Sequence, residues 1–126
     1  MVPMKVDEVV DYATNERWAI RILSLQPTVT KAKVLGMLKV GNHPVFELQT
    51  DIPYSEAADT IARLPENPRT VFVIVGLDEA RSGSQRVVLD LLTHQRPIIA
   101  VDHPVQKAME LSISLRTRFV QTEVEE

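Results

Sequence analysis

Two short, wholly apolar runs on either side of a helical pattern constrain this 126-residue chain most strongly. Residues 71–75 read VFVIV and residues 98–101 read IIAV, with no polar residue in either run. Strands without a polar face are typical of sheets that helices cover on both sides. Between the runs, apolar residues recur with helical spacing over residues 85–94. Strands joined through a helix pair in parallel by a right-handed crossover, so this half of the chain predicts a helix-covered parallel sheet.

The first half of the chain has a different pattern. Residues 17–25 and 31–40 alternate apolar and polar side chains, and residues 45–50 continue the alternation after the turn sequence VGNHPV. A period of two is typical of a strand with one face toward the core. We therefore expect an antiparallel meander over residues 17–50. Residues 5–15 fit either a short helix or a strand.

The predicted fold class is α/β, with a single domain over residues 1–120. Its mixed sheet begins with the N-terminal antiparallel meander and continues with alternating helices and parallel strands. Further helices are expected over residues 55–64 and 104–118, from the spacing of their apolar residues. Residues 121–126, QTEVEE, are expected to form a frayed acidic tail.

Composition excludes several classes of protein. The apolar fraction of 44% and charged fraction of 25% are those of an ordinary globular domain. The formal net charge of -3 argues against nucleic-acid binding by bulk charge. The chain has no cysteine, which rules out disulfides and cysteine-type zinc sites. No apolar run approaches the roughly 20 residues of a membrane span. We therefore expect a cytoplasmic protein that does not enter a membrane.

Acidic side chains follow both apolar runs at the point where each predicted strand ends. Asp78 and Glu79 come shortly after residues 71–75, and Asp102 directly follows residues 98–101. The carboxyl ends of parallel strands meet at one edge of a sheet, where ligands of open α/β proteins bind. Carboxylate oxygens are the ligands that Mg²⁺ prefers. The pattern indicates a candidate metal site, although an aspartate between a strand and a helix is also a common helix cap.

Two other features have both a functional and a structural interpretation. The sequence RSGS at residues 81–84 could offer backbone N–H groups to a phosphate at a helix start. The chain contains neither GxGxxG nor GxxxxGK[ST], so a flexible turn with Ser84 as the helix N-cap is the alternative. The basic residues of the expected meander could form a local face for nucleic acid, or simply a solvated sheet face. They are Arg21, Lys31, Lys33 and Lys39.

Three segments resemble the YqgF/RuvC-like family of the RNase H fold. VVDYATNERWAIRI resembles its first strand and turn, FVIVGLDEARSGSQRVV its middle strand and PIIAVD a later strand, with Ala13 in place of the usual turn glycine. The resemblance implies a set of catalytic carboxylates made up of Asp11, Asp78, Glu79 and Asp102. Of these, Asp11, Asp78 and Asp102 would bind Mg²⁺ and support two-metal cleavage of a phosphodiester.

Two functions therefore remain open from the sequence, and with them the question of whether the chain is an enzyme. One is an Mg²⁺-dependent nuclease or resolvase of the RNase H type that acts on nucleic acid. The other is a non-catalytic α/β module that binds a protein or a small ligand. The second could act as a homo-oligomer.

Overall fold

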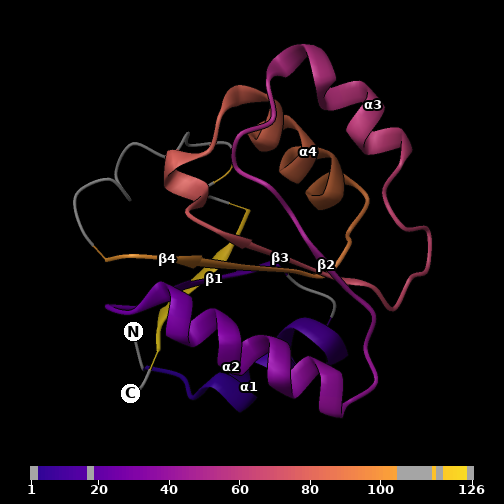
Figure 1. The fold of residues 1–126 in the computed structure, drawn as a ribbon. Coiled ribbons are helices and arrows are strands. Elements are labelled where there is room, and N and C mark those ends of the chain that lie inside the picture. Colours follow the sequence, from indigo (N-terminus) through magenta and orange to yellow (C-terminus); the bar gives the residue numbers. More distant parts are fainter. Residues whose placement is uncertain (1–2, 17–18, 105–114, 116–117, 125–126) are drawn as a thin grey trace.

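In the computed structural model, the described residues are 3–16, 19–104, 115 and 118–124. They form three layers, with α1 and α2 on one face of a central sheet and α3 and α4 on the other (Figure 1). The helices are α1 (Val6–Asn15), α2 (Pro27–Val40), α3 (Ala57–Ala62) and α4 (Ser82–Thr93), with 3₁₀ turns η1 (Tyr54–Glu56) and η2 (Leu77–Glu79). The strands are β1 (Ala19–Leu23), β2 (Val45–Glu47), β3 (Val71–Val75), β4 (Ile98–Asp102) and β5 (Val120–Glu123). No helix among the described residues is long and apolar enough to cross a membrane.

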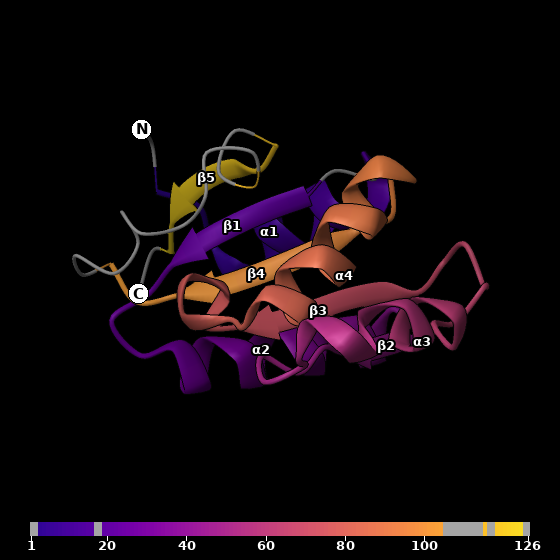
Figure 2. The ribbon, with the colours of Figure 1, turned by 90° about the horizontal axis from the view of Figure 1, so that it is seen from above.

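The sheet has the strand order β2-β3-β4-β1-β5, and every pairing between its strands is parallel. Figure 2 shows this order across the sheet, with β5 at one edge and β2 at the other. The predicted mixed sheet with an antiparallel meander is therefore wrong. The α/β class itself is confirmed.

The predicted strand over residues 31–40 is also wrong, because these residues belong to α2. The buried residues of this helix, Thr30, Val34 and Leu38, are four positions apart, as expected for one helical face. Apolar residues also lie on its outer side, where Val40 is 85% exposed. Apolar side chains on both sides of a helix hide its 3.6-residue period, and the sequence then fits a period of two.

Other expected elements have mixed outcomes. The helix around residues 55–64, the helix after β3, and the strands β1, β3 and β4 are confirmed, and residues 5–15 resolve as the helix α1. Residues 45–50 contain β2, but it pairs in parallel with β3 and not with a preceding strand. Residues 120–123 form β5 in the sheet, where a frayed tail was expected from residue 121. Most of the helix expected over residues 104–118 lies outside the described residues.

Each central strand is buried on both faces, which accounts for its continuous apolar sequence. Phe72 and Ile74 of β3 pack toward α4, while Val71 and Val73 pack toward α1 and α2. The sheet therefore divides the core into two layers.

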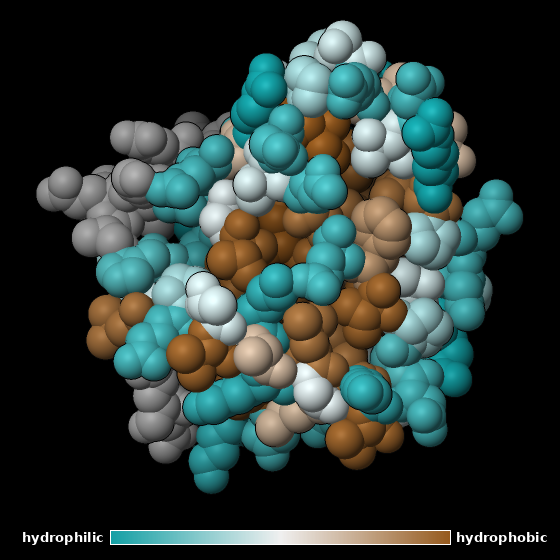
Figure 3. All heavy atoms as spheres, viewed as in Figure 1, coloured by the Kyte–Doolittle hydropathy of each residue, from teal (hydrophilic) through white to brown (hydrophobic). Residues whose placement is uncertain are grey.

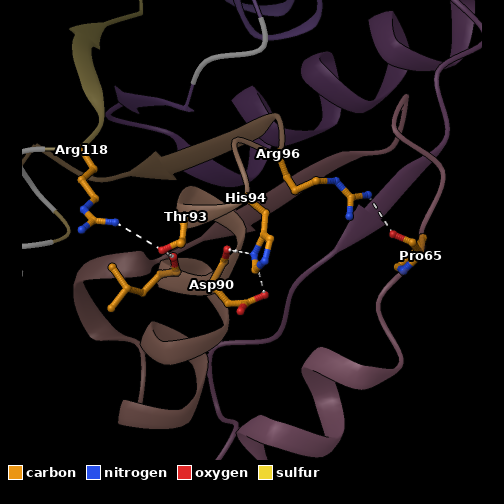
Figure 4. Close-up of polar contacts among 7 residues, drawn as sticks. Pro65, Asp90, Thr93, His94, Arg96 and Arg118 are labelled. Atoms are coloured by element: carbon orange, nitrogen blue, oxygen red, sulfur yellow. Dashed lines mark hydrogen bonds and ion pairs between the residues drawn. The ribbon is translucent and has the colours of Figure 1, made fainter.

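Arg96 holds the long connection before β3 against the amino edge of the sheet. Its guanidinium lies 4.9 Å from the ring centroid of Phe72 and donates hydrogen bonds to the carbonyls of Pro65 (2.8 Å) and Asn67 (3.0 Å). Figure 4 shows Arg96 reaching from the end of α4 toward Pro65, beside His94. A cation over an aromatic face with charge-assisted hydrogen bonds is a stable anchor for an irregular segment.

Candidate functional site

The carboxyl edge of the sheet between β1 and β4 is the natural place for a ligand in this topology. The chain leaves β1 for α2 on one face of the sheet and leaves β3 for α4 on the other (Figure 1). Ligands of open α/β sheets bind where the direction of the connections changes in this way. Here the strand ends are closely tied, since Ser24 N–H donates to the Asp102 carbonyl (2.8 Å) and Gly76 N–H donates to the Val101 carbonyl (3.0 Å).

Arg21 and Asp102 form a buried ion pair at this edge. Arg21 Nε lies 2.6 Å from Asp102 Oδ2, and both residues are almost fully buried. The other carboxylate oxygen, Oδ1, accepts a hydrogen bond from Leu77 N–H (2.8 Å), and Arg21 Nη1 donates to Gln121 Oε1 (2.9 Å). Both oxygens of Asp102 are therefore engaged by the protein, and the pair connects β4 with β1, β5 and η2.

The ion pair corrects the expected basic face. Arg21 is buried among the strands and cannot share an exposed surface with the three lysines. Lys31 projects from α2 and forms an ion pair with Glu47 at the sheet edge. The sequence signal that was missed is an arginine inside an apolar strand, since a buried arginine needs an acidic partner.

Asp78 lies in η2 beside this ion pair and is only partly buried. Burial raises the pKa of its carboxyl group, the negative charges of Asp102 and Glu79 raise this pKa further, and Arg21 opposes the shift. The structure thus brings Asp78 and Asp102 into one electrostatic environment, as the shared strand edge predicted.

Replacement Asp78→Asn is expected to stabilise the protein at neutral pH. A raised pKa means that the folded state holds the proton more tightly than the unfolded state does. The ionised carboxylate therefore destabilises the fold above its folded-state pKa, and this penalty disappears as the pH falls through that value toward about 4. Urea unfolding at pH 7 and at about pH 4 should show a gain only at pH 7. The exposed Asp11→Asn on α1 is the control; an equal gain in it, or an Asp78→Asn gain that persists at low pH, would refute this origin.

Asp11 lies on a different element from the other predicted carboxylates. It is exposed on α1, because that helix turns its valines and Ala13 toward the sheet and its acidic residues toward solvent. Among the described residues, which include all four predicted carboxylates, no group of three His, Cys, Asp or Glu side chains is placed to hold a metal ion. Asp102 and Asp78 come together, while Asp11 stands apart on the outer side of α1.

The RSGS segment starts α4, and another part of the chain already occupies that helix terminus. Ser84 Oγ donates to the Gln49 carbonyl (2.7 Å) and accepts from Ile52 N–H (3.1 Å). Arg81 N–H donates to the Thr50 carbonyl (2.8 Å). Arg81, rather than Ser84, is the N-cap residue. This terminus therefore anchors the segment after β2, whose backbone lies against the start of α4.

The turn between β1 and α2 is short and internally bonded. It contains only Ser24, Leu25 and Gln26 before the helix begins at Pro27. The hydroxyl groups of Ser24 and Thr30 are 2.7 Å apart, and Gln26 N–H donates to Ser24 Oγ (3.0 Å). Proline at the first helical position removes one N–H group that a ligand could otherwise bind.

The described part of the chain is similar in fold to two solved proteins. A solved DNA polymerase III gamma subunit-related protein from Thermotoga maritima matches with a TM-score of 0.64 and 14% identity, over 98% of this chain and 46% of that one. The RuvB Holliday junction branch migration motor from the same organism matches with a TM-score of 0.57 and 16% identity, over 95% of this chain and 44% of that one. The chain thus spans less than half the length of either protein. No protein-family model and no curated protein matches it.

The parallel sheet and these similarities overturn the resemblance to the YqgF/RuvC-like family of the RNase H fold. That resemblance depended on strand ends that are followed by acidic residues, a feature which many parallel sheets share. The Mg²⁺-dependent nuclease or resolvase inferred from it is overturned as well. At 14–16% identity, the similarity to the two proteins establishes the fold and not the activity.

Proposed function

We propose that this chain is a non-hydrolysing relative of the P-loop ATPase domains, with a structural, protein-binding role in an assembly that acts on DNA. The observation that carries this proposal is the three-residue turn between β1 and α2. In P-loop proteins the strand-to-helix connection is a glycine-rich GxxxxGK[ST] loop whose backbone N–H groups surround the phosphates. The turn of this chain contains no glycine, and its Ser24 shares a hydrogen bond with Thr30 in the first turn of α2.

The residues at the site do not fit a nucleotide with its Mg²⁺ ion. The N–H of Gln26 already donates to Ser24, and the backbone at α2 begins with a proline. The acidic group at the neighbouring strand end, Asp102, gives one oxygen to Arg21 and the other to Leu77. A metal would have to displace a buried guanidinium, which would leave an unpaired charge in the core.

Nucleotide binding is the competing function, and the fold itself favours it. P-loop domains generally use nucleotide with Mg²⁺, so the predicted magnesium belongs to this alternative. The two alternatives differ in whether the β1–α2 turn can open to admit phosphates.

The remaining parts of the proposal come from the proteins that share the fold. One is a Holliday junction motor and the other is related to a DNA polymerase subunit, which supports a DNA-associated complex. We propose that this complex is cytoplasmic. Contact with nucleic acid would come through that complex, because the predicted basic face is not formed as a unit. The apolar outer side of α2, which includes Val29 and Val40, offers a surface for subunit contacts, and a homo-oligomer is compatible with it.

Calorimetric titration with ATP and Mg²⁺ tests the proposal. We expect no saturable heat up to about 1 mM nucleotide. At that concentration, even a weak site with a binding free energy of about -4 kcal/mol is half occupied. Leu25→Asp is the matched control, because it adds a negative charge to an exposed position in the turn. Saturable binding that this variant weakens would overturn the proposal and assign the turn to nucleotide.

A further inference from the structure

The edge strand β2 exposes backbone groups that are not used by the described sheet. Among the described strands, β2 pairs with β3 alone, through bonds such as Val71 N–H to the Pro44 carbonyl and Leu48 N–H to the Val73 carbonyl, both 2.8 Å. In a parallel pair, alternate residues of a strand bond to the same neighbour. The N–H and C=O groups of Val45 and Glu47 therefore point away from β3, where the described sheet has no further strand.

Two grooves flank this edge, one on each face of the sheet. The groove on the α3 side has a volume of about 550 Å³, with Phe46, Leu48 and Ile52 as its apolar part. On the α2 side, a hollow of about 570 Å³ is lined by Leu35 and other residues around the β2 start. Glu47 lines both. Figure 3 views the molecule from the side on which β2 forms the sheet edge, and it shows apolar surface between hydrophilic groups. An added strand would direct alternate side chains into the two grooves.

The charges around the α3-side groove are mainly negative. Glu56 and Asp59 contribute two carboxylates, and Arg63 is the single cation among the described residues that line it. Glu47 also lines the groove, but its carboxylate forms an ion pair with Lys31 of α2. A lysine or arginine fits such a groove, because its aliphatic stem covers apolar surface while its charged end reaches the carboxylates. Leu35, Pro44 and Val45 form the apolar part of the α2-side groove, and Lys39, Asn42, His43 and Glu47 form its polar part. Apolar side chains fit the first part, and the charge of Lys39 disfavours further cations.

We propose that β2 binds an extended peptide segment of a partner protein, added to the sheet edge as a further strand, with basic and apolar side chains in alternation. The basic side chains lie over Phe46 and Leu48 toward Glu56 and Asp59, and the apolar ones lie on the α2 side. Main-chain hydrogen bonds to Val45 and Glu47 give affinity, and the two grooves give specificity.

A charged side chain on an edge strand is also a common protection against aggregation. Glu47 serves that purpose equally well, since its charge repels acidic strands and the Lys31 ion pair covers part of the edge. A second copy of β2 is a poor match for this surface, because it would bring another Glu47 to an edge that already carries Glu47, Glu56 and Asp59. The same charge selects a basic segment.

Fluorescence anisotropy with a labelled decapeptide of alternating lysine and valine tests the proposal, with alternating glutamate and valine as the control peptide. We expect saturable binding of the basic peptide only, weakened by added salt. Val45→Pro removes one outward N–H but none of the bonds to β3, and proline is tolerated at such edge positions. It should weaken binding by about fivefold to tenfold. Glu56 and Asp59 are both exposed. The double variant Glu56→Gln with Asp59→Asn should weaken binding of the basic peptide and reduce the salt dependence of that binding.

Three outcomes would overturn the proposal. These are equal binding of the two peptides, binding that Val45→Pro leaves unchanged, and a dimer without peptide that Val45→Pro dissociates. The last would assign the edge to a second copy of the chain. The inference deepens the proposed function by naming a class of partner. The two proposals can fail separately. A chain that binds ATP at the turn and also binds the basic peptide would refute the proposed function and leave the peptide-binding inference standing.

Discussion

Asp102→Ala is expected to reduce the free energy of unfolding by about 3–5 kcal/mol, the usual effect of removing one partner of a buried ion pair. The Arg21 guanidinium would stay buried without its carboxylate, and its Nη2 atom already has no hydrogen-bond partner among the described residues. Leu77 N–H would also lose its acceptor. Urea denaturation at pH 7, followed by circular dichroism, measures the change.

The double variant Arg21→Met with Asp102→Leu is the control for this result. Replacing both members of a buried pair by apolar residues is often neutral for stability, so the double variant should recover much of the loss. A single Asp102→Ala variant within about 1 kcal/mol of the parent protein would contradict the buried pair. Equal instability of the single and double variants would show that the loss comes from packing and not from charge.

Gly83→Ala is expected to destabilise the protein by about 1–3 kcal/mol. A Cβ atom at Gly83 would overlap the backbone carbonyl groups of Ile52 and Pro53. The segment before η1 cannot easily retreat, because Ser84 and Arg81 hold it by hydrogen bonds to Gln49, Ile52 and Thr50. The close approach of this backbone to the start of α4 therefore requires glycine.

Gly36→Ala makes the same chemical change with the opposite expected sign. Gly36 lies inside α2 with open space around its missing side chain. Alanine in an exposed helix interior is more stable than glycine by up to about 1 kcal/mol. Thermal unfolding of both variants beside the parent protein compares them directly, and destabilisation by Gly36→Ala or none by Gly83→Ala would contradict the packing of the two helices.

The local sequence pattern was sufficient to predict the strands that are buried on both faces. The runs at β3 and β4 have no polar face, so their strand character and their shared carboxyl edge could be predicted, and Asp78 and Asp102 do lie at that edge. α2 could not be predicted this way, since Val40 and other apolar residues on its outer side obscured its period. The α/β class was predicted correctly, and the antiparallel pairing of the first strands was wrong.

Long-range pairing accounts for the other errors. Arg21 and Asp102 are 81 positions apart in the chain, and only the placement of β1 beside β4 brings them together. Ser84 looked like a helix cap, yet its hydroxyl binds a segment more than 30 residues earlier. No periodicity in a single sequence reports contacts of this kind, so both the ion pair and the occupied α4 terminus emerge only from the three-dimensional fold.

The account depends most on the closed turn between β1 and α2, and amide NMR during titration with ATP and Mg²⁺ tests it directly. We predict that the amide signals of Leu25, Gln26 and Thr30 stay unchanged up to about 1 mM nucleotide, a level that would half-fill a site of millimolar affinity. Saturable shifts centred on these three residues would contradict the account, because they would show that the turn opens and binds the phosphates.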